Sequence, residues 1–161
     1  MSGKQRHNVV PGVACFIFIE DKVLLIKASE AKEWKGKYTP LGGHIEKGES
    51  VIAAANREIK EESGLTVFDT KLKGIVHVSG FYGKDIMLFV TSSKSKTKEV
   101  MSGYEGELEW VKISDLDKKD ILEDVRPVLK HILEMNPGDI FVGSSEFDGV
   151  DKLVSFDVKI N

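Results

Sequence analysis

The stretch of sequence that decides the fold is GHIEKGESVIAAANREIKEESGL, which runs from Gly43 to Leu65. Residues 50–63 are largely of types with a high intrinsic preference for helix. Gly64 follows at the position where a left-handed C-terminal cap favours glycine. Apolar residues recur at helical spacing in this segment and would form one stripe: Ile52, Ala55 and Ile59. The sequence therefore predicts an amphipathic helix over residues 50–63.

Three glutamates of this segment, Glu58, Glu61 and Glu62, are also spaced three and four residues apart, so they lie on one face of the helix. Like charges at this spacing repel one another unless cations lie between them. Mg²⁺ suits such a face because it prefers carboxylate oxygens and keeps positions for water and phosphate. Arg57 precedes Glu61 by four residues and can orient its carboxylate. The alternative is a solvated helix with ordinary ion pairs.

Two glycines, Gly42 and Gly43, precede the helix by a short loop. Paired glycines allow the backbone to approach a ligand closely, although a plain tight turn would use them too. Glu49 lies just before the helix and cannot reach the three glutamates at helical spacing. We expect Gly43 and Glu49 to support the site rather than to carry its chemistry.

The fixed positions in this stretch resemble the signature of the Nudix hydrolases without exception: Gly43, Glu49, Arg57, Glu58, Ile59, Glu61, Glu62, Gly64 and Leu65. A chance match is expected on the order of once in 10^8 windows. The resemblance implies metal-dependent hydrolysis of a nucleoside diphosphate joined to another group, with Mg²⁺ as the cofactor and Mn²⁺ as an alternative. It also implies that the backbone carbonyl of Gly42 binds metal together with Glu58, Glu61 and Glu62.

Family members often take a further carboxylate from a loop beyond this motif, and Glu105 is our candidate because it follows the flexible segment Ser102-Gly103. The alternative for Glu105 is an exposed acidic strand edge. Family members differ in which glutamate accepts the proton of the attacking water. The base therefore stays open among Glu58, Glu61, Glu62 and Glu105, with Arg57 as the orienting residue.

The segment from Leu122 to Arg126 resembles the place where the MutT-like branch of the family, which acts on oxidised purine nucleotides, reads the base. Asp124 is the first candidate for this contact and Glu123 the second, while the alternative for Asp124 is a helix N-cap. Thr39 and Leu122 would line the pocket, although the branch often has asparagine and an aromatic residue there. The expected reaction is cleavage of a nucleoside triphosphate to the monophosphate and pyrophosphate, with oxidised purines preferred.

Two other functions remain open. Tyr82 stands seventeen residues after Leu65, and a tyrosine at about this distance marks the diadenosine polyphosphate hydrolases of the family. The same tyrosine, beside Gly80 and Gly83, is equally typical of a turn. A catalytically silent binding module would typically have lost a glutamate of the motif, and this chain keeps them all.

The remaining sequence predicts an α/β fold. We expect strands over 12–19, 22–27, 38–45, 66–79 with a break near Gly74, 85–92 and 107–113, then a helix over 123–135 and a hairpin of strands 140–145 and 153–160. The resemblance implies a Nudix-type α/β/α sandwich with a mixed central sheet. At 161 residues, a single domain over 1–161 is the expectation.

The composition of the chain argues against some classes of binding partner. The net charge of −3 argues against a broad nucleic-acid-binding face but allows a small nucleotide substrate bound through metal. No apolar stretch approaches the roughly 18 residues of a membrane span. The lone Cys15 cannot form a disulfide within the chain and suits a reducing cytosol. We expect a cytoplasmic enzyme, monomer or homodimer, with no membrane or nucleic-acid partner.

Overall fold

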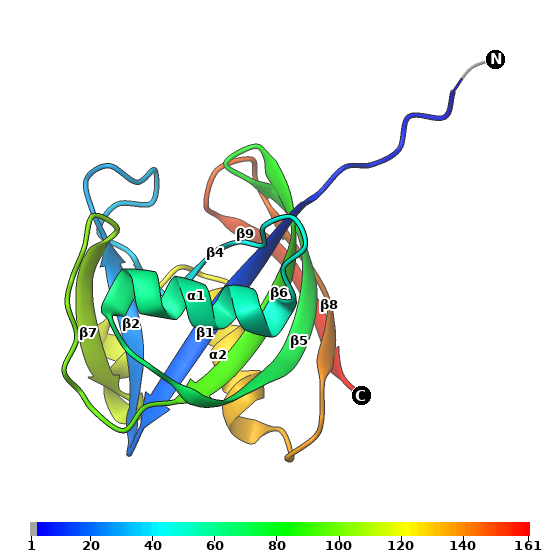
Figure 1. Ribbon diagram of the computed structural model, residues 1–161. Coiled ribbons are helices and arrows are strands. Elements are labelled where there is room, and N and C mark those ends of the chain that lie inside the picture. Colours follow the sequence, from blue (N-terminus) through cyan, green and yellow to red (C-terminus); the bar gives the residue numbers. More distant parts are fainter. Residues whose placement is uncertain (1–2) are drawn as a thin grey trace.

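The computed structural model describes residues 3–161 and shows one mixed sheet with a helix on each face (Figure 1). This arrangement confirms the expected α/β class. The N-terminal arm leads away from the body before the first strand (Figure 1). The elements are β1 (Val10–Ile19), β2 (Lys22–Ala28), β3 (Tyr38–Thr39), β4 (Leu41–His44), α1 (Val51–Ser63), β5 (Phe68–Phe81), β6 (Lys84–Lys94), β7 (Gly106–Lys112), the 3-10 helix η1 (Ile113–Lys118), α2 (Val125–Glu134), β8 (Phe141–Phe147) and β9 (Leu153–Ile160).

The sheet has the strand order β3-β2-β1-β6-β5-β8-β9, with β4 on β1 and β7 on β2. The pairs β1–β6 and β5–β8 are parallel, and the other pairs are antiparallel. Strand β1 changes partner along one edge, because residues 17–19 pair with β2 whereas residues 12–15 pair with β4. The sheet therefore forks at β1, and β2 continues away with β3 and β7 as neighbours.

Both faces of the sheet are buried at β1, where successive residues supply opposite faces. Ala14 and Phe16 belong to the cluster beneath α2, whereas Cys15 and Ile17 belong to the cluster beneath α1. Side chains alternate between the two faces because successive residues of a β-strand point in opposite directions. It explains why β1 reads as a continuous apolar run, and it places Cys15 in the core as expected.

The predicted helix over residues 50–63 is confirmed. The Ser50 hydroxyl accepts a hydrogen bond from the Ala53 N–H at 3.1 Å, which caps the helix at its start. Gly64 ends it with φ 76°. The predicted apolar stripe is wrong at Ile52, which lies 36% exposed, and Ala54 is buried in its place beside Ala55 and Ile59.

Two further details differ from the sequence prediction. Strand β5 is continuous from Phe68 to Phe81, and the expected break near Gly74 is a shift in its register with β6. The ring of Phe141 fills the space that a side chain at residue 74 would need, so only glycine fits there. Helix α2 is shorter than predicted, and Leu133 is 44% exposed rather than in the core.

No helix in residues 3–161 is both long enough and apolar enough to cross a membrane.

Candidate functional site

A cavity of about 580 Å³ opens where the sheet forks. One end is polar and is formed by the loop and strand before α1 together with one face of α1. The other end is mainly apolar and is formed by β2, β5, β6 and the start of α2. The polar end includes Lys32, Gly42, Gly43, His44, Glu46, Arg57, Glu58, Glu61, Glu62 and Glu105. The apolar end includes Ile26, Trp34, Thr39, Val78, Phe81, Ile86, Leu88, Leu122, Asp124 and Val125.

The paired glycines Gly42 and Gly43 allow α1 to lie close to the loop before it. The carboxylate of Glu58 occupies the space that a side chain at Gly43 would need, so any larger residue would displace it. Gly42 faces the backbone of Val13 in the same way, and its N–H donates to Oε2 of Glu62 at 3.2 Å. These contacts explain why the motif requires glycine beside its glutamates.

Arg57 organises the polar end. Its Nε donates to Oε1 of Glu49 at 2.7 Å, and its Nη2 donates to Oε2 of Glu49 at 3.0 Å. Its Nη1 donates to Glu58 at 2.8 Å and more weakly to Glu61 at 3.3 Å. A further bond from Nη2 to the His44 carbonyl, at 3.0 Å, ties it to the loop. Arg57 therefore fixes Glu58 more firmly than Glu61, the partner that sequence spacing suggested.

Glu62 is the most perturbed carboxylate of the polar end. Burial raises the pKa of Glu62 to about 8, and the charges of Glu58 and Glu105 act in the same direction. The N–H of Gly42 and the charge of Lys32 oppose this rise. A carboxylate that is costly to ionise without a cation, placed beside other carboxylates, is typical of a functional site.

Glu105 reaches this end of the cavity from the loop before β7, as the sequence suggested. Its carboxylate forms an ion pair with Lys32, which lies on the loop between β2 and β3. Its charge also contributes to the raised pKa of Glu62, so the two carboxylates lie within electrostatic range of each other. Sequence reasoning did not single out Lys32, which brings a cation to the acidic end.

The donor set at the polar end fits Mg²⁺. Among residues 3–161, no three His, Cys, Asp or Glu side chains converge into a preformed cage. Instead, Arg57 pairs with Glu58 and Glu61, and Lys32 pairs with Glu105. Mg²⁺ does not need such a cage, since it usually takes one or two carboxylates and completes its shell with water and substrate phosphates. The high pKa of Glu62 is the local observation that favours a cation here.

At the other end of the cavity, Asp124 is a buried carboxyl among apolar neighbours. Its side chain makes no capping hydrogen bond to α2, so the N-cap alternative describes its position but not its contacts. Its Oδ1 is buried and has no hydrogen-bond partner. Burial raises the pKa of Asp124 to about 6, helped by the charge of Glu123 and opposed by backbone N–H groups. Asp124 lines the cavity, and an unpaired buried polar atom is costly unless a ligand satisfies it.

The other expected pocket residues divide into two groups. Thr39 and Leu122 line the cavity, as the resemblance implied. Glu123 does not, because its carboxylate points to β9 and accepts the Leu153 N–H at 2.6 Å. Of the two candidates for contact with the base, these contacts therefore favour Asp124 over Glu123. Tyr82 is also absent from the lining.

Comparison with known proteins points to one family and one fold. A family model described as the NUDIX domain matches residues 9–132, which include the whole signature and Asp124. The chain is similar to a solved structure of a mutator MutT protein from Bacillus halodurans, with a TM-score of 0.81 and 26% sequence identity over 95% of this chain and 98% of that one. The sandwich implied by the signature is thus confirmed.

Two curated relatives share parts of the sequence. An uncharacterised Nudix hydrolase of Bacillus subtilis, YvcI, is 32% identical over 107 residues, which are 63% of this chain and 65% of YvcI. The 8-oxo-dGDP phosphatase NUDT18 of Homo sapiens is 41% identical over 61 residues, 37% of this chain and 19% of that protein. The matches thus span less than two thirds of either relative. With the family model covering most of its length, the chain belongs to the Nudix hydrolase family.

Proposed function

We propose that this protein hydrolyses a nucleoside triphosphate to the monophosphate and pyrophosphate, and that it prefers an oxidised purine base. The observation that carries the proposal is the pairing of two ends in one cavity: signature carboxylates at one end and the unpaired Asp124 at the other. A nucleotide has the matching polarity, with anionic phosphates at one end and a planar base with polar edges at the other.

Asp124 would select the base. A purine edge that carries N–H donors would satisfy its free Oδ1, whereas a base without a matching donor would leave it buried and unpaired. Sites built in this way discriminate strongly between substrates. The likeness to a MutT protein, and to a relative described as an 8-oxo-dGDP phosphatase, supports the same base class.

Mg²⁺ would be held by Glu58, Glu61 and Glu62 together with the Gly42 carbonyl, and when bound it neutralises phosphate charge and lowers the pKa of water. Arg57 keeps Glu58 in place, and Glu49 keeps Arg57 in place. One carboxylate of the set Glu58, Glu61, Glu62 and Glu105 would accept the proton of the attacking water. Lys32 lines the same end of the cavity and offers a positive charge to the phosphates.

A diadenosine polyphosphate hydrolase is less well supported. The tyrosine that suggested it, Tyr82, donates its hydroxyl to the Glu33 carbonyl at 3.1 Å and does not line the cavity. It therefore acts within the protein rather than on a substrate.

The test is a panel of nucleotides with Mg²⁺, ranked by kcat/KM: oxidised and normal guanosine triphosphates, diadenosine polyphosphates and ADP-ribose. We expect the oxidised triphosphate to rank first and to release pyrophosphate. A Glu62→Gln protein purified in parallel measures contaminating phosphatase activity. Equal kcat/KM for the two guanosine triphosphates, or a higher value for another class, would contradict the proposal.

A further inference from the structure

A tryptophan on the loop between β2 and β3 lines the cavity without belonging to the core. Trp34 contributes to the cavity wall, yet neither hydrophobic cluster includes it. Its neighbours Glu33 and Lys35 are exposed. A large aromatic ring that is only partly buried and that lines a cavity is available to a ligand.

Backbone hydrogen bonds give this loop a defined shape. The Ala28 N–H donates to the Lys37 carbonyl at 2.9 Å and closes the base of the loop. Within the loop, the Lys37 N–H donates to the Trp34 carbonyl at 3.2 Å. The Ser29 N–H donates to the Glu105 carbonyl at 3.1 Å, which joins the loop to the segment before β7. Trp34 is thus presented from a fixed turn.

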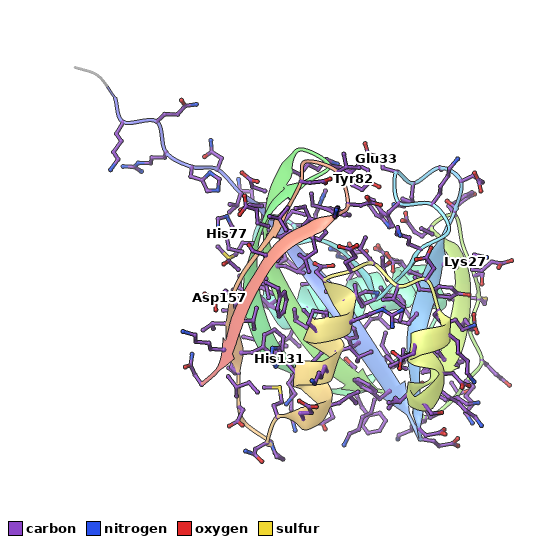
Figure 2. The ribbon with its side chains drawn as sticks, turned by 180° about the vertical axis from the view of Figure 1, so that it is seen from behind. Lys27, Glu33, His77, Tyr82, His131 and Asp157 are labelled. Atoms are coloured by element: carbon purple, nitrogen blue, oxygen red, sulfur yellow. The ribbon has the colours of Figure 1, made fainter. Side chains whose placement is uncertain are left out.

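A second loop, the turn between β5 and β6, supports the ring from one side. The Trp34 centroid lies 5.3 Å from that of Phe81 and 6.0 Å from that of Tyr82. The Tyr82 hydroxyl donates to the Glu33 carbonyl at 3.1 Å, and the two labelled residues lie together at one end of the molecule (Figure 2). Tyr82 and Gly83 have φ values of 48° and 72°, typical of a two-residue hairpin turn. Phe81 and Tyr82 therefore limit how the indole can turn.

The same loop also reaches the acidic end of the cavity. Lys32 Nζ lies 5.7 Å from the Trp34 ring centroid while it pairs with Glu105. A nucleotide whose phosphates lie among the signature carboxylates and Lys32 would therefore carry its base toward Trp34.

We infer that the Trp34 indole stacks on the base of the nucleotide and is a specificity-determining residue of this site. The bicyclic indole overlaps a purine more fully than a pyrimidine, so Trp34 favours purines while Asp124 reads the edge of the base. The inference rests on the proposed function, since it takes a nucleotide as the ligand. Stacking of one base on an aromatic side chain changes affinity by roughly 5- to 150-fold.

Fluorescence tests the contact directly, because the chain has two tryptophans. Trp110 lies on β7, where its indole N–H donates to the Lys98 carbonyl, and it does not line the cavity. In a Trp110→Phe protein, guanosine monophosphate is expected to quench the emission of Trp34, whereas ribose 5-phosphate, which has no base, is not. In a Trp34→Phe protein, neither compound should change the emission of Trp110. Equal effects of both compounds on Trp34 would overturn the inference.

Kinetics provides the second readout. Trp34→Leu keeps an apolar side chain but cannot stack, so it should raise KM for guanosine triphosphate by roughly 5- to 150-fold and leave kcat within about twofold. Trp34→Phe should recover part of the loss. Lys35→Ala is the matched control, because Lys35 lies on the same loop, pairs with Glu30 and does not line the cavity. An unchanged KM in Trp34→Leu would overturn the inference.

The two proposals fail differently. Hydrolysis by the wild-type protein without base-dependent quenching would refute the stacking role and leave the proposed function standing. Quenching by guanosine monophosphate in a protein that cleaves no nucleotide would refute the proposed function, while the stacking site would stand.

Discussion

The carboxylate of Glu49 accepts two parallel hydrogen bonds from Arg57, at 2.7 Å from Nε and at 3.0 Å from Nη2. These bonds hold the pKa of Glu49 at about 2, so the carboxylate stays charged at any working pH. With Nε and Nη2 engaged, the Nη1 of Arg57 is left to hold Glu58. Glu49 therefore acts on the site through Arg57.

We expect Glu49→Gln to lower kcat/KM by roughly 10- to 100-fold, because weakening an outer contact disturbs the groups that it orients. Pyrophosphate release with saturating Mg²⁺ is the measurement. Glu134→Gln, an equal change of charge on an exposed residue at the end of α2, is the control and should have no effect. If Glu49→Gln proves more damaging than Glu62→Gln, Glu49 has a direct role that the contacts do not explain.

Glu62→Gln is expected to keep the fold and lose about 10^2-fold or more in kcat. The amide oxygen can still accept the Gly42 N–H, but the negative charge that stabilises bound cations is gone. Circular dichroism and the melting temperature establish folding, and turnover in Mg²⁺ measures the loss. Turnover close to that of wild type would remove Glu62 from the metal site.

Magnesium binding should release a proton. The pKa of Glu62 is about 8 without metal, so its carboxyl is mostly protonated at pH 7 and must ionise to bind a cation. Calorimetric titrations in buffers of different ionisation enthalpy should give a release of nearly one proton at pH 7 that falls toward zero above pH 9. The release should be absent in Glu62→Gln. A release at pH 7 that survives this substitution would assign the proton to another group.

The signature helix and its acidic face could be read from the sequence because both depend on local spacing. Ser50, Gly64 and the glutamates act within one or two turns of their own helix. Strand positions were likewise accessible, since β1 and β2 are apolar on both faces. The prediction differed from the structure where contacts between distant residues shape a strand. An example is Gly74 of β5, which lies against the Phe141 ring.

The other residues of the site could not be predicted from the sequence, because their positions depend on which strands become neighbours. The fork at β1 brings Lys32 and Trp34, which lie on a charged loop, to the same cavity as α1. Asp124 and Glu123 are adjacent carboxyls with similar local signals. Only the packing of α2 and β9 directs Asp124 inward and Glu123 toward the Leu153 N–H.

Burial of Asp124 is expected to lower the free energy of unfolding by an amount that depends on pH. Its pKa is about 6 in the folded protein, against about 3.8 for an ordinary aspartate, so between these values the folded state holds a proton that the unfolded state has released. Stability therefore falls as pH rises from about 4 to about 6, and above pH 6 the full penalty of roughly 3 kcal/mol applies. An uncharged residue of the same shape avoids this penalty.

Asp124→Asn is therefore expected to melt at a higher temperature than wild type at pH 8, with the difference shrinking toward pH 4. Scanning calorimetry of both proteins at several pH values is the measurement, and Glu134→Gln, which changes the same charge on an exposed residue at the end of α2, is the control. The same substitution should reduce the preference for oxidised over normal guanosine triphosphate, because the base then meets an amide in place of the carboxyl. A gain in stability at pH 8 without any change in base preference would make Asp124 an ordinary buried acid. If the base preference is lost but the melting temperature shows no pH-dependent gain, Asp124 is not buried as a charged group.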